Sequence, residues 1–217
     1  MYVPQHFQET RVEVLHELIR AHPLATVVTL AAGGINANHI PLLLALAPDG
    51  SGTLRGHVAR ANPMWSDRVE QVEALAIFQG PHAYVSPSWY PAKREHGKVV
   101  PTWNYVVVHA HGPLRVIDDP AWLRGQLESL VARHEALSAS PWSISDAPDE
   151  FITRMIESIV GFEITVSRLV GKWKVSQNQT GANRAGAVAG LIERGGADDL
   201  QVAALIEEAS RDRRSGQ

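Results

Sequence analysis

The chain has 217 residues, of which 45% are apolar and 20% are charged, a balance typical of a globular protein that buries a substantial core. Its net charge of −3 gives no general attraction to nucleic acid or anionic membrane, and the absence of cysteine excludes disulfides, thiolate nucleophiles and cysteine-ligated metal sites. The first residues lack the layout of a secretory signal and no apolar run reaches the roughly 18 residues of a membrane span, so we expect a cytoplasmic protein without a membrane partner.

The first half predicts one helix followed by short strands. Thr10 and Glu13 form a capping box before apolar residues at helical spacing, and Pro23 ends this helix at about His22. Glycine-rich turn signals then separate β-compatible runs at residues 24–32, 36–46 and 53–58. A short helix over residues 64–69 precedes two further strands, "EALAIFQG" and "HAYVS".

The second half mixes one long strand with helices. A strand over residues 102–116 should bend or break at Gly112-Pro113. Asp119 is the expected N-cap of a helix that begins with Pro120 and ends near Glu135. A second helix with an apolar face at 151–159, a last strand "VGFEITVSRL" and, from residue 182, two helices joined by a Gly-Gly pair complete the chain.

This order of elements predicts the architecture. Hairpin-connected strands without alternating crossover helices favour an α+β fold, mainly β, built round an antiparallel barrel with surrounding helices. We expect residues 1–180 to form the main domain, and residues 181–217 to form a helical hairpin appended to it.

The stretch "TLRGHVARANP" is the first candidate site. Its guanidinium, imidazole and carboxamide groups, at the end of a strand and before a predicted helix, are suited to hold a phosphate. They are Arg55, His57, Arg60 and Asn62. The alternative is that the two arginines are solvated surface charges, because the chain has neither a Walker A loop nor a G-x-G-x-x-G loop.

The stretch "NANHIPLLL" is the second candidate. Pro41 cannot donate to a strand ladder, so this run is an edge, a bulge or a place where a ligand replaces the partner strand. Asn38 and His39 are placed to hydrogen-bond the edge of a heterocycle; the alternative is a bulge with polar residues at a sheet rim.

The strand "TWNYVVVHAHG" is the third candidate. Strand alternation places one set of side chains on one face: Trp103, Tyr105, Val107, His109 and His111. The other face carries Thr102, Asn104, Val106, Val108 and Ala110, and its valines and alanine belong in a core. The aromatic and histidine face therefore belongs to a groove or an interface. His109 and His111 offer two nitrogens to a metal, but no third ligand has diagnostic spacing, which favours hydrogen bonding at a subunit contact.

Two aromatic and basic segments complete the candidates. In "GKWKVSQN", Lys172 and Lys174 flank Trp173, and the segment either covers an anionic cofactor or is a polar loop. The crossover "SPSWYPAKREHGKVVPTWNY" is stiffened by prolines, and its aromatic ends should face a common cleft or dimer seam. Those ends carry Trp89, Tyr90, Trp103 and Tyr105, whereas Lys93 to Lys98 form a solvated tip.

Two function classes lack support. No G-x-S-x-G elbow surrounds a serine, so the sequence gives no sign of a hydrolase nucleophile and names no catalytic residue. The C-terminal hairpin carries Asp198, Asp199, Glu207 and Glu208 where a recognition helix would need basic residues, and Arg211, Arg213 and Arg214 trail off its end. Local sequence therefore does not support direct DNA contact.

Several blocks together resemble a known family. They include "MYVPQHF", "NANHIPLLL", "GTLRGHVARANPMW", "IFQGPHAYVSPSWYP", "HGKVVPTWNYVVVHAHGPLRVIDDPAWL" and "GKWKVSQN". From Met1 to about Leu191 the chain is similar to the PaiB family of FMN-binding negative transcriptional regulators.

The resemblance implies an FMN-binding split β-barrel, a six-stranded antiparallel fold that works as a homodimer. By that analogy "RGHVARANP" holds the FMN phosphate and "NANHIP" lies near the isoalloxazine ring. The stretches "PSWY" and "PTWNY", which include Trp89, Trp103, Asn104 and Tyr105, line the same cleft or its partner surface. The family label makes DNA a possible partner. The alternatives are an FMN-dependent oxidoreductase or flavin reductase, and a haem-handling split-barrel protein.

Overall fold

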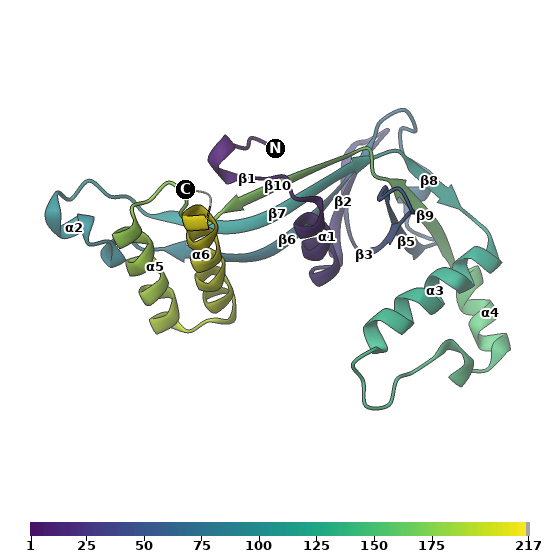
Figure 1. Cartoon of the computed structure of the whole chain (residues 1–217). Helices are drawn as coiled ribbons and strands as arrows, with labels where there is room; N and C mark the ends of the chain where they lie inside the picture. Colours follow the sequence, from purple (N-terminus) through teal and green to yellow (C-terminus); the bar gives the residue numbers. More distant parts are fainter. Residues whose placement is uncertain (216–217) are drawn as a thin grey trace. The chain divides into compact units, whose positions relative to one another are not determined.

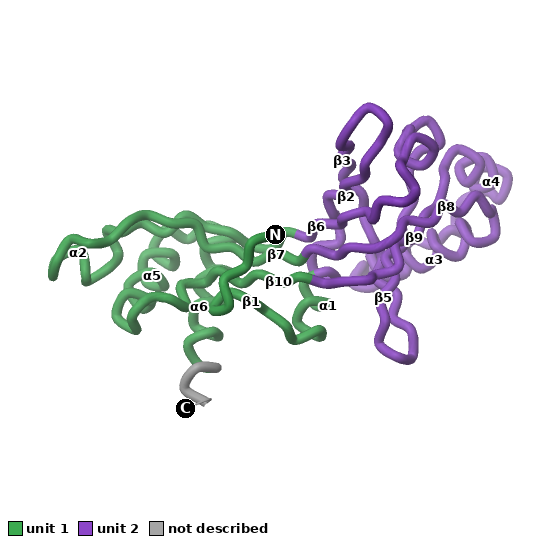
Figure 2. The backbone as a smooth tube through the Cα atoms, turned by 90° about the horizontal axis from the view of Figure 1, so that it is seen from above, with its two compact units in different colours: residues 1–18, 79–108, 170–217 green, residues 19–78, 109–169 purple. Residues whose placement is uncertain are grey.

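The computed structural model describes residues 1–215, and the side chains of residues 1–211. Two compact units emerge, one formed by residues 1–18, 79–108 and 170–217, and the other by residues 19–78 and 109–169. Figure 2 shows them in green and purple. We call them unit 1 and unit 2, and the strands β6, β7 and β10 and the helix α1 contribute residues to both.

The elements follow in chain order (Figure 1). The strands are β1 (Gln8–Glu9), β2 (Leu24–Ala31), β3 (Gly34–Pro41), β4 (Leu43–Leu46), β5 (Gly52–Ala59), β6 (Ala74–Val85), β7 (Thr102–Gly112), β8 (Leu114–Ile117), β9 (Ile159–Thr165) and β10 (Arg168–Lys174). The helices are α1 (Val12–Ala21), α2 (Ala92–Glu95), α3 (Pro120–Glu135), α4 (Asp149–Glu157), α5 (Gly181–Arg194) and α6 (Ala197–Ser215). The side chains of Arg213 and Arg214 lie outside the described residues.

The strands form two sheets. One has the order β1-β10-β7-β6-β2-β3 and the other β4-β5-β9-β8. The pairings β1–β10, β2–β3, β2–β6, β4–β5, β5–β9 and β8–β9 are all antiparallel. The antiparallel, helix-decorated sheet architecture expected from the order of elements is confirmed.

The core of unit 2 lies between its strands and beneath its helices. On β5 and β9 the alternate residues Leu54, Val58, Val160, Phe162 and Ile164 are buried, as expected for strands with one face in the core. A second cluster of Leu123, Ile144, Ile152 and Ile156 joins α3 to α4. Asp119 caps α3 as predicted, because its carboxylate accepts hydrogen bonds from the N–H groups of Ala121 and Trp122.

Unit 1 buries one face of its strands under helices. A side chain at Gly80 of β6 would meet Leu18 of α1 and Val106 of β7, so α1 packs closely on that face. The helices α5 and α6 pack against each other and are joined at Gly195, whose φ of 72° is the left-handed conformation that glycine adopts without strain. The hairpin predicted from residue 182 is therefore confirmed.

Four expected boundaries were wrong. The run 36–46 divides at Leu42 into β3 and β4, and the short helix over 64–69 is only a 3-10 turn at Pro63–Trp65. "EALAIFQG" and "HAYVS" form the single strand β6, in which Gly80 and Pro81 are both buried and shift the phase of alternation without ending the strand. The segment "VGFEITVSRL" turns at residues 166–167, so β10 is a separate last strand that contains Lys172 and Lys174.

Candidate functional site

The strand β5 presents the first predicted site residues on one face. Leu54, Gly56 and Val58 point into the core, so Arg55 and His57 occupy the opposite face with intermediate exposure. That face is partly covered by α3, because the amide of Gln126 donates to the backbone carbonyl of Arg55 at 3.3 Å. Arg55 and His57 therefore lie on the outside of the sheet, at its contact with a helix.

His57 lies partly buried beside this helix. It is opposite Gly161 of β9, where a side chain would overlap the ring of Trp122 from α3. Burial lowers the pKa of His57, which favours the neutral imidazole, and its Nδ1 atom is buried without a hydrogen-bond partner among the described residues.

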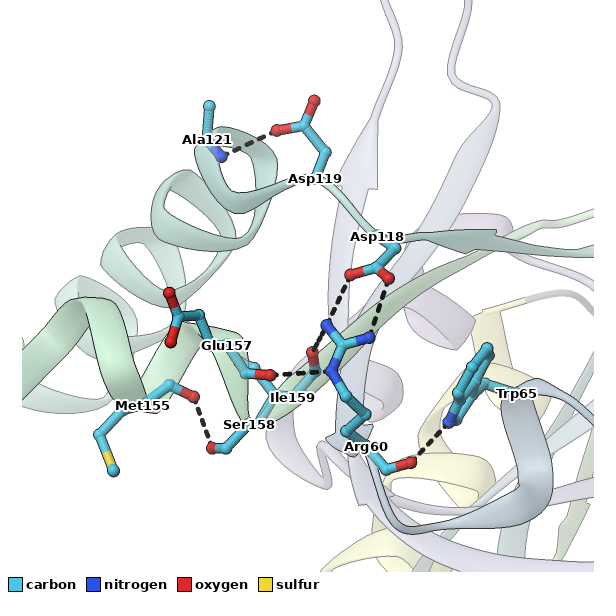
Figure 3. Close-up of polar contacts among 9 residues, drawn as sticks. All are labelled: Arg60, Trp65, Asp118, Asp119, Ala121, Met155, Glu157, Ser158 and Ile159. Carbon is cyan, nitrogen blue, oxygen red and sulfur yellow. Dashed lines mark hydrogen bonds and ion pairs between the residues drawn. The ribbon is translucent and has the colours of Figure 1, made fainter.

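Arg60 is engaged with protein groups (Figure 3). Its Nη1 and Nη2 atoms donate to the Asp118 carboxylate at 2.8 and 2.7 Å, Nε donates to the Glu157 carbonyl at 2.8 Å, and Nη2 also reaches the Ile159 carbonyl at 3.0 Å. The hydrogen bond with Asp118 raises the pKa of Arg60, and the same bond lowers the pKa of Asp118. Arg60 thus links the end of β5 to the start of α3 and to the α4–β9 connection, and its role as a phosphate ligand stays a prediction that would require it to leave these partners.

The structure brings the first two predicted stretches together through their asparagines. Asn62 Nδ2 donates to Asn38 Oδ1 at 2.8 Å, and Asn62 Oδ1 accepts from the Met64 N–H at 2.9 Å. The Nδ1 atom of His39 is 3.1 Å from the Thr26 hydroxyl on the neighbouring strand. The loop after β5 is therefore tied directly to β3, which makes a polar cluster from two segments far apart in sequence.

The residues predicted from the aromatic stretches fall in unit 1. Trp103 is 54% exposed, and its ring centroid lies 6.0 Å from those of both His82 and Tyr84 on β6. The Lys172 ammonium lies 5.2 Å from the Tyr105 ring centroid, within the range of a cation–π interaction. Together these residues make an aromatic and basic face on β6, β7 and β10, which we call the aromatic face.

Lys174 lies on the same side of β10 as Lys172. Its ammonium donates to the Thr102 hydroxyl at 2.5 Å. Burial lowers the pKa of Lys174, with nearby Tyr105 opposing that shift. The lysine is therefore held against the strand β7 in this structure.

Asn104 and Trp89 lie elsewhere in unit 1. Asn104 points to the opposite face of β7, is fully buried and donates to the Ser176 hydroxyl at 2.8 Å. Trp89 packs on α5, since a side chain at Gly190 would overlap its indole ring, and the Arg194 guanidinium lies 5.1 Å from the ring centroid. The structure thus groups neither residue with Trp103 and Tyr105, and their cofactor roles remain predictions.

The histidine pair of β7 lies in unit 2. The ring centroids of His109 and His111 are 6.4 Å apart. Burial is the main reason why the pKa of His109 is lowered to about 4, so that it is neutral at pH 7. Within the described part of the chain, no cluster of three or more His, Asp or Glu side chains is placed to hold a metal ion.

Sequence reasoning missed two residues beside Arg55. Glu163 of β9 lies opposite both Arg55 of β5 and Arg115 of β8, and its carboxylate accepts hydrogen bonds from both guanidinium groups. The signal was present in the sequence, because Glu163 is the charged residue in the otherwise apolar or small run "IVGFEITV". A charge in a buried strand predicts a partner on a neighbouring strand.

A comparison with protein-family models identifies the family of this chain. The family model described as "Putative FMN-binding domain" matches residues 1–168. The chain belongs to this family. The resemblance to the PaiB family is confirmed, and FMN is the cofactor that goes with it.

Relatives extend the match to nearly the whole chain. An uncharacterized protein of Emericella nidulans is 34% identical over 244 aligned residues, which cover 96% of this chain and 97% of that protein. The "Protease synthase and sporulation protein PAI 2" of Bacillus subtilis is 31% identical over 208 residues, with 96% of this chain and 97% of that protein covered. Because 96% of this chain is covered, both alignments extend well beyond residue 168, where the family model ends.

Solved structures confirm the fold. The flavocytochrome Anf3 of Azotobacter vinelandii superposes with a TM-score of 0.55 at 15% identity, over 83% of this chain and 73% of that one. The chain therefore folds as a split β-barrel, as expected.

The donor set of unit 2 fits FMN. The cofactor carries a phosphate monoester and a ring system whose edge both donates and accepts hydrogen bonds. Arg55 offers a guanidinium that is only partly engaged, and Asn38 and Asn62, which are bonded to each other, offer amide groups of the kind that read such an edge. His39 follows Asn38 on β3 and therefore points to the opposite face of the strand. When bound, FMN would supply the redox chemistry, and these residues would bind and orient it.

Proposed function

We propose that the protein is an FMN-binding homodimer that acts as a negative transcriptional regulator of the PaiB type in the cytoplasm. The observation that carries this proposal is the alignment with the "Protease synthase and sporulation protein PAI 2" of Bacillus subtilis, which covers 96% of this chain and 97% of the relative. A shared family and a nearly complete alignment favour a shared role, and the experiments below test it for this chain.

The aromatic face supports the homodimer. Tyr84 and Trp103 are 39% and 54% exposed on adjacent strands, although such large rings are costly to leave in water. Tyrosine and tryptophan rings and the aliphatic part of lysine side chains give a surface with an apolar centre and a polar, solvent-accessible rim, as in protein–protein interfaces. A second copy of the chain is the partner that we assign to it.

The regulatory part of the proposal does not depend on α6 reading a DNA groove. Asp199 in its first turn is paired with Arg194, and Asp198 lies 3.4 Å from His82. These acidic groups are part of the packing of unit 1 and would repel phosphates. We therefore propose that flavin binding, and a contact made elsewhere on the dimer, carry the regulatory signal.

Three measurements on the purified protein test this function. An absorbance band at about 450 nm, typical of oxidised flavin, is expected after purification or after addition of FMN. Light scattering should give twice the mass of one chain, and the protein should retard a fragment of its own promoter in a salt-dependent way. A protein that takes up no FMN, stays monomeric and binds no promoter at low salt would overturn the proposal, whereas bleaching of the band by NAD(P)H would favour a flavin reductase instead.

A further inference from the structure

A row of three charged side chains crosses the four-stranded sheet of unit 2. Arg55 of β5 and Arg115 of β8 both lie opposite Glu163 of the intervening strand β9. Glu163 is buried, with 8% of the residue exposed. Its carboxylate accepts hydrogen bonds from Arg55 Nε at 2.9 Å and from Arg115 Nη2 at 2.6 Å. Because two positive charges flank one negative charge, the row keeps a net charge of +1 (+2 − 1).

The carboxylate engages only a part of each guanidinium group. A guanidinium has five N–H donors in a fixed fork, and among the described residues Arg55 uses only Nε and Arg115 only Nη2. The two arginine side chains are 41% and 69% exposed. The row therefore presents unused, accessible donors from two guanidinium groups that a shared carboxylate holds on adjacent strands.

Two threonines extend the row along the strands. Thr53 of β5 pairs with Thr165 of β9, two residue pairs from the pair of Arg55 with Glu163. Because residues two apart on a strand share a face, Thr53 and Thr165 lie on the same face as the charged row. Their hydroxyls add neutral donors beside the guanidinium groups.

Arg60 has few donors left by comparison. It makes four hydrogen bonds, two to the Asp118 carboxylate and two to backbone carbonyls, and the carboxylate neutralises its charge. Of the arginines near β5, Arg55 and Arg115 thus retain both excess charge and free N–H groups.

We propose that Arg55 and Arg115, held in place by Glu163, bind the phosphate monoester of FMN, with Thr53 and Thr165 beside them. This inference rests on the proposed function, because it presumes that the chain binds FMN. A phosphate dianion accepts hydrogen bonds from two guanidinium forks at once, which a single lysine or a fully paired arginine cannot offer. Glu163 reduces the repulsion between the two arginines and fixes where their forks point, so it is a positioning residue.

The test compares FMN with riboflavin, which has the same ring system without the phosphate. Dissociation constants for both flavins are measured by fluorescence quenching with the wild type and with Arg115→Ala. We expect the variant to bind FMN about 10- to 100-fold more weakly, since a hydrogen-bonded charge pair is lost. Its affinity for riboflavin should stay within about twofold of that of the wild type. The ratio of the two dissociation constants, which measures the preference for FMN, should therefore fall by nearly as much as the affinity for FMN.

Matched variants separate this role from a structural one. Arg124→Ala removes another arginine of unit 2 with a single exposed ion pair, to Asp149, and should leave the preference unchanged. Glu163→Gln removes the carboxylate charge that holds both guanidinium groups in place but keeps the groups themselves, and should lower the preference for FMN by a smaller factor than Arg115→Ala does. If Arg115→Ala does not fold, Arg115→Lys retains the ion pair and should lower the preference by a smaller factor.

The outcomes are distinct. A loss of FMN preference in the Arg115 variants that Arg124→Ala does not share supports the assignment. An unchanged preference, or an equal loss for both flavins, overturns it while leaving FMN binding intact. A wild type that binds neither flavin refutes the proposed function, and the phosphate assignment with it.

Discussion

Replacing Gly190 with alanine should destabilise the protein, although alanine is the better helix former. Gly190 lies within α5, and a methyl group there would overlap the indole ring of Trp89. Overpacking of this kind costs about 1–3 kcal/mol, whereas exchanging glycine for alanine inside a helix gains about 0.5–1 kcal/mol. We therefore expect a net loss of about 1–2 kcal/mol, or roughly 2–8 °C in Tm for a chain of this size.

Gly125→Ala is the matched control. Gly125 lies within α3, and a methyl group there would meet no atom within 4 Å. Only the propensity gain remains, so this variant should be more stable than the wild type by about 0.5–1 kcal/mol. Urea or thermal unfolding followed by circular dichroism measures both variants. Equal stabilisation by both substitutions would refute the packing of Trp89 on α5.

Three further predictions follow from the geometry of the two units. The free energy of unfolding should fall as pH is lowered from about 6.5 toward about 4, because burial lowers the pKa of His109 and the unfolded chain binds the proton at higher pH than the folded chain. In His109→Gln the urea concentration at the unfolding midpoint should depend less on pH in this range, and the same pH dependence as in the wild type would contradict the burial of His109. Arg60→Ala should lower Tm, since it breaks the links to Asp118 and to the α4–β9 connection, with FMN preference over riboflavin unchanged; a selective loss of FMN affinity would instead favour the prediction of Arg60 as a phosphate ligand. Trp103→Glu should shift the protein from dimer to monomer in light scattering, whereas Trp142→Glu, at another exposed tryptophan, should not, and a dimeric Trp103→Glu variant would argue against the aromatic face as the interface.

Much of the fold could be predicted from the sequence, because local signals and tertiary structure agree there. Asp119 and Pro120 mark the start of α3, and Gly195 marks the end of α5, since caps and turns depend on neighbouring residues alone. The errors arose where tertiary contacts decide. Pro81 reads as a break, but β6 continues through it as a local irregularity in a strand that is held by neighbours on the sheet.

The candidate site was less predictable than the fold. Alternation correctly placed Trp103 and Tyr105 on one face, because it follows from strand geometry alone. It could not show that Arg60 meets Asp118 or that Asn62 meets Asn38, since these pairs are 58 and 24 residues apart in sequence. The Arg55–Glu163–Arg115 row likewise depends on strand register, which sequence patterns do not fix across three separate strands.

The most direct test of the central claim is the stoichiometry of FMN on the purified protein. After saturation with FMN and removal of the free cofactor, the flavin absorbance and the mass of the extracted ligand give the moles of FMN per chain. Our account predicts one FMN per chain, with the phosphate intact in the extracted cofactor. A protein that retains no flavin, or that retains riboflavin as firmly as FMN, would contradict it.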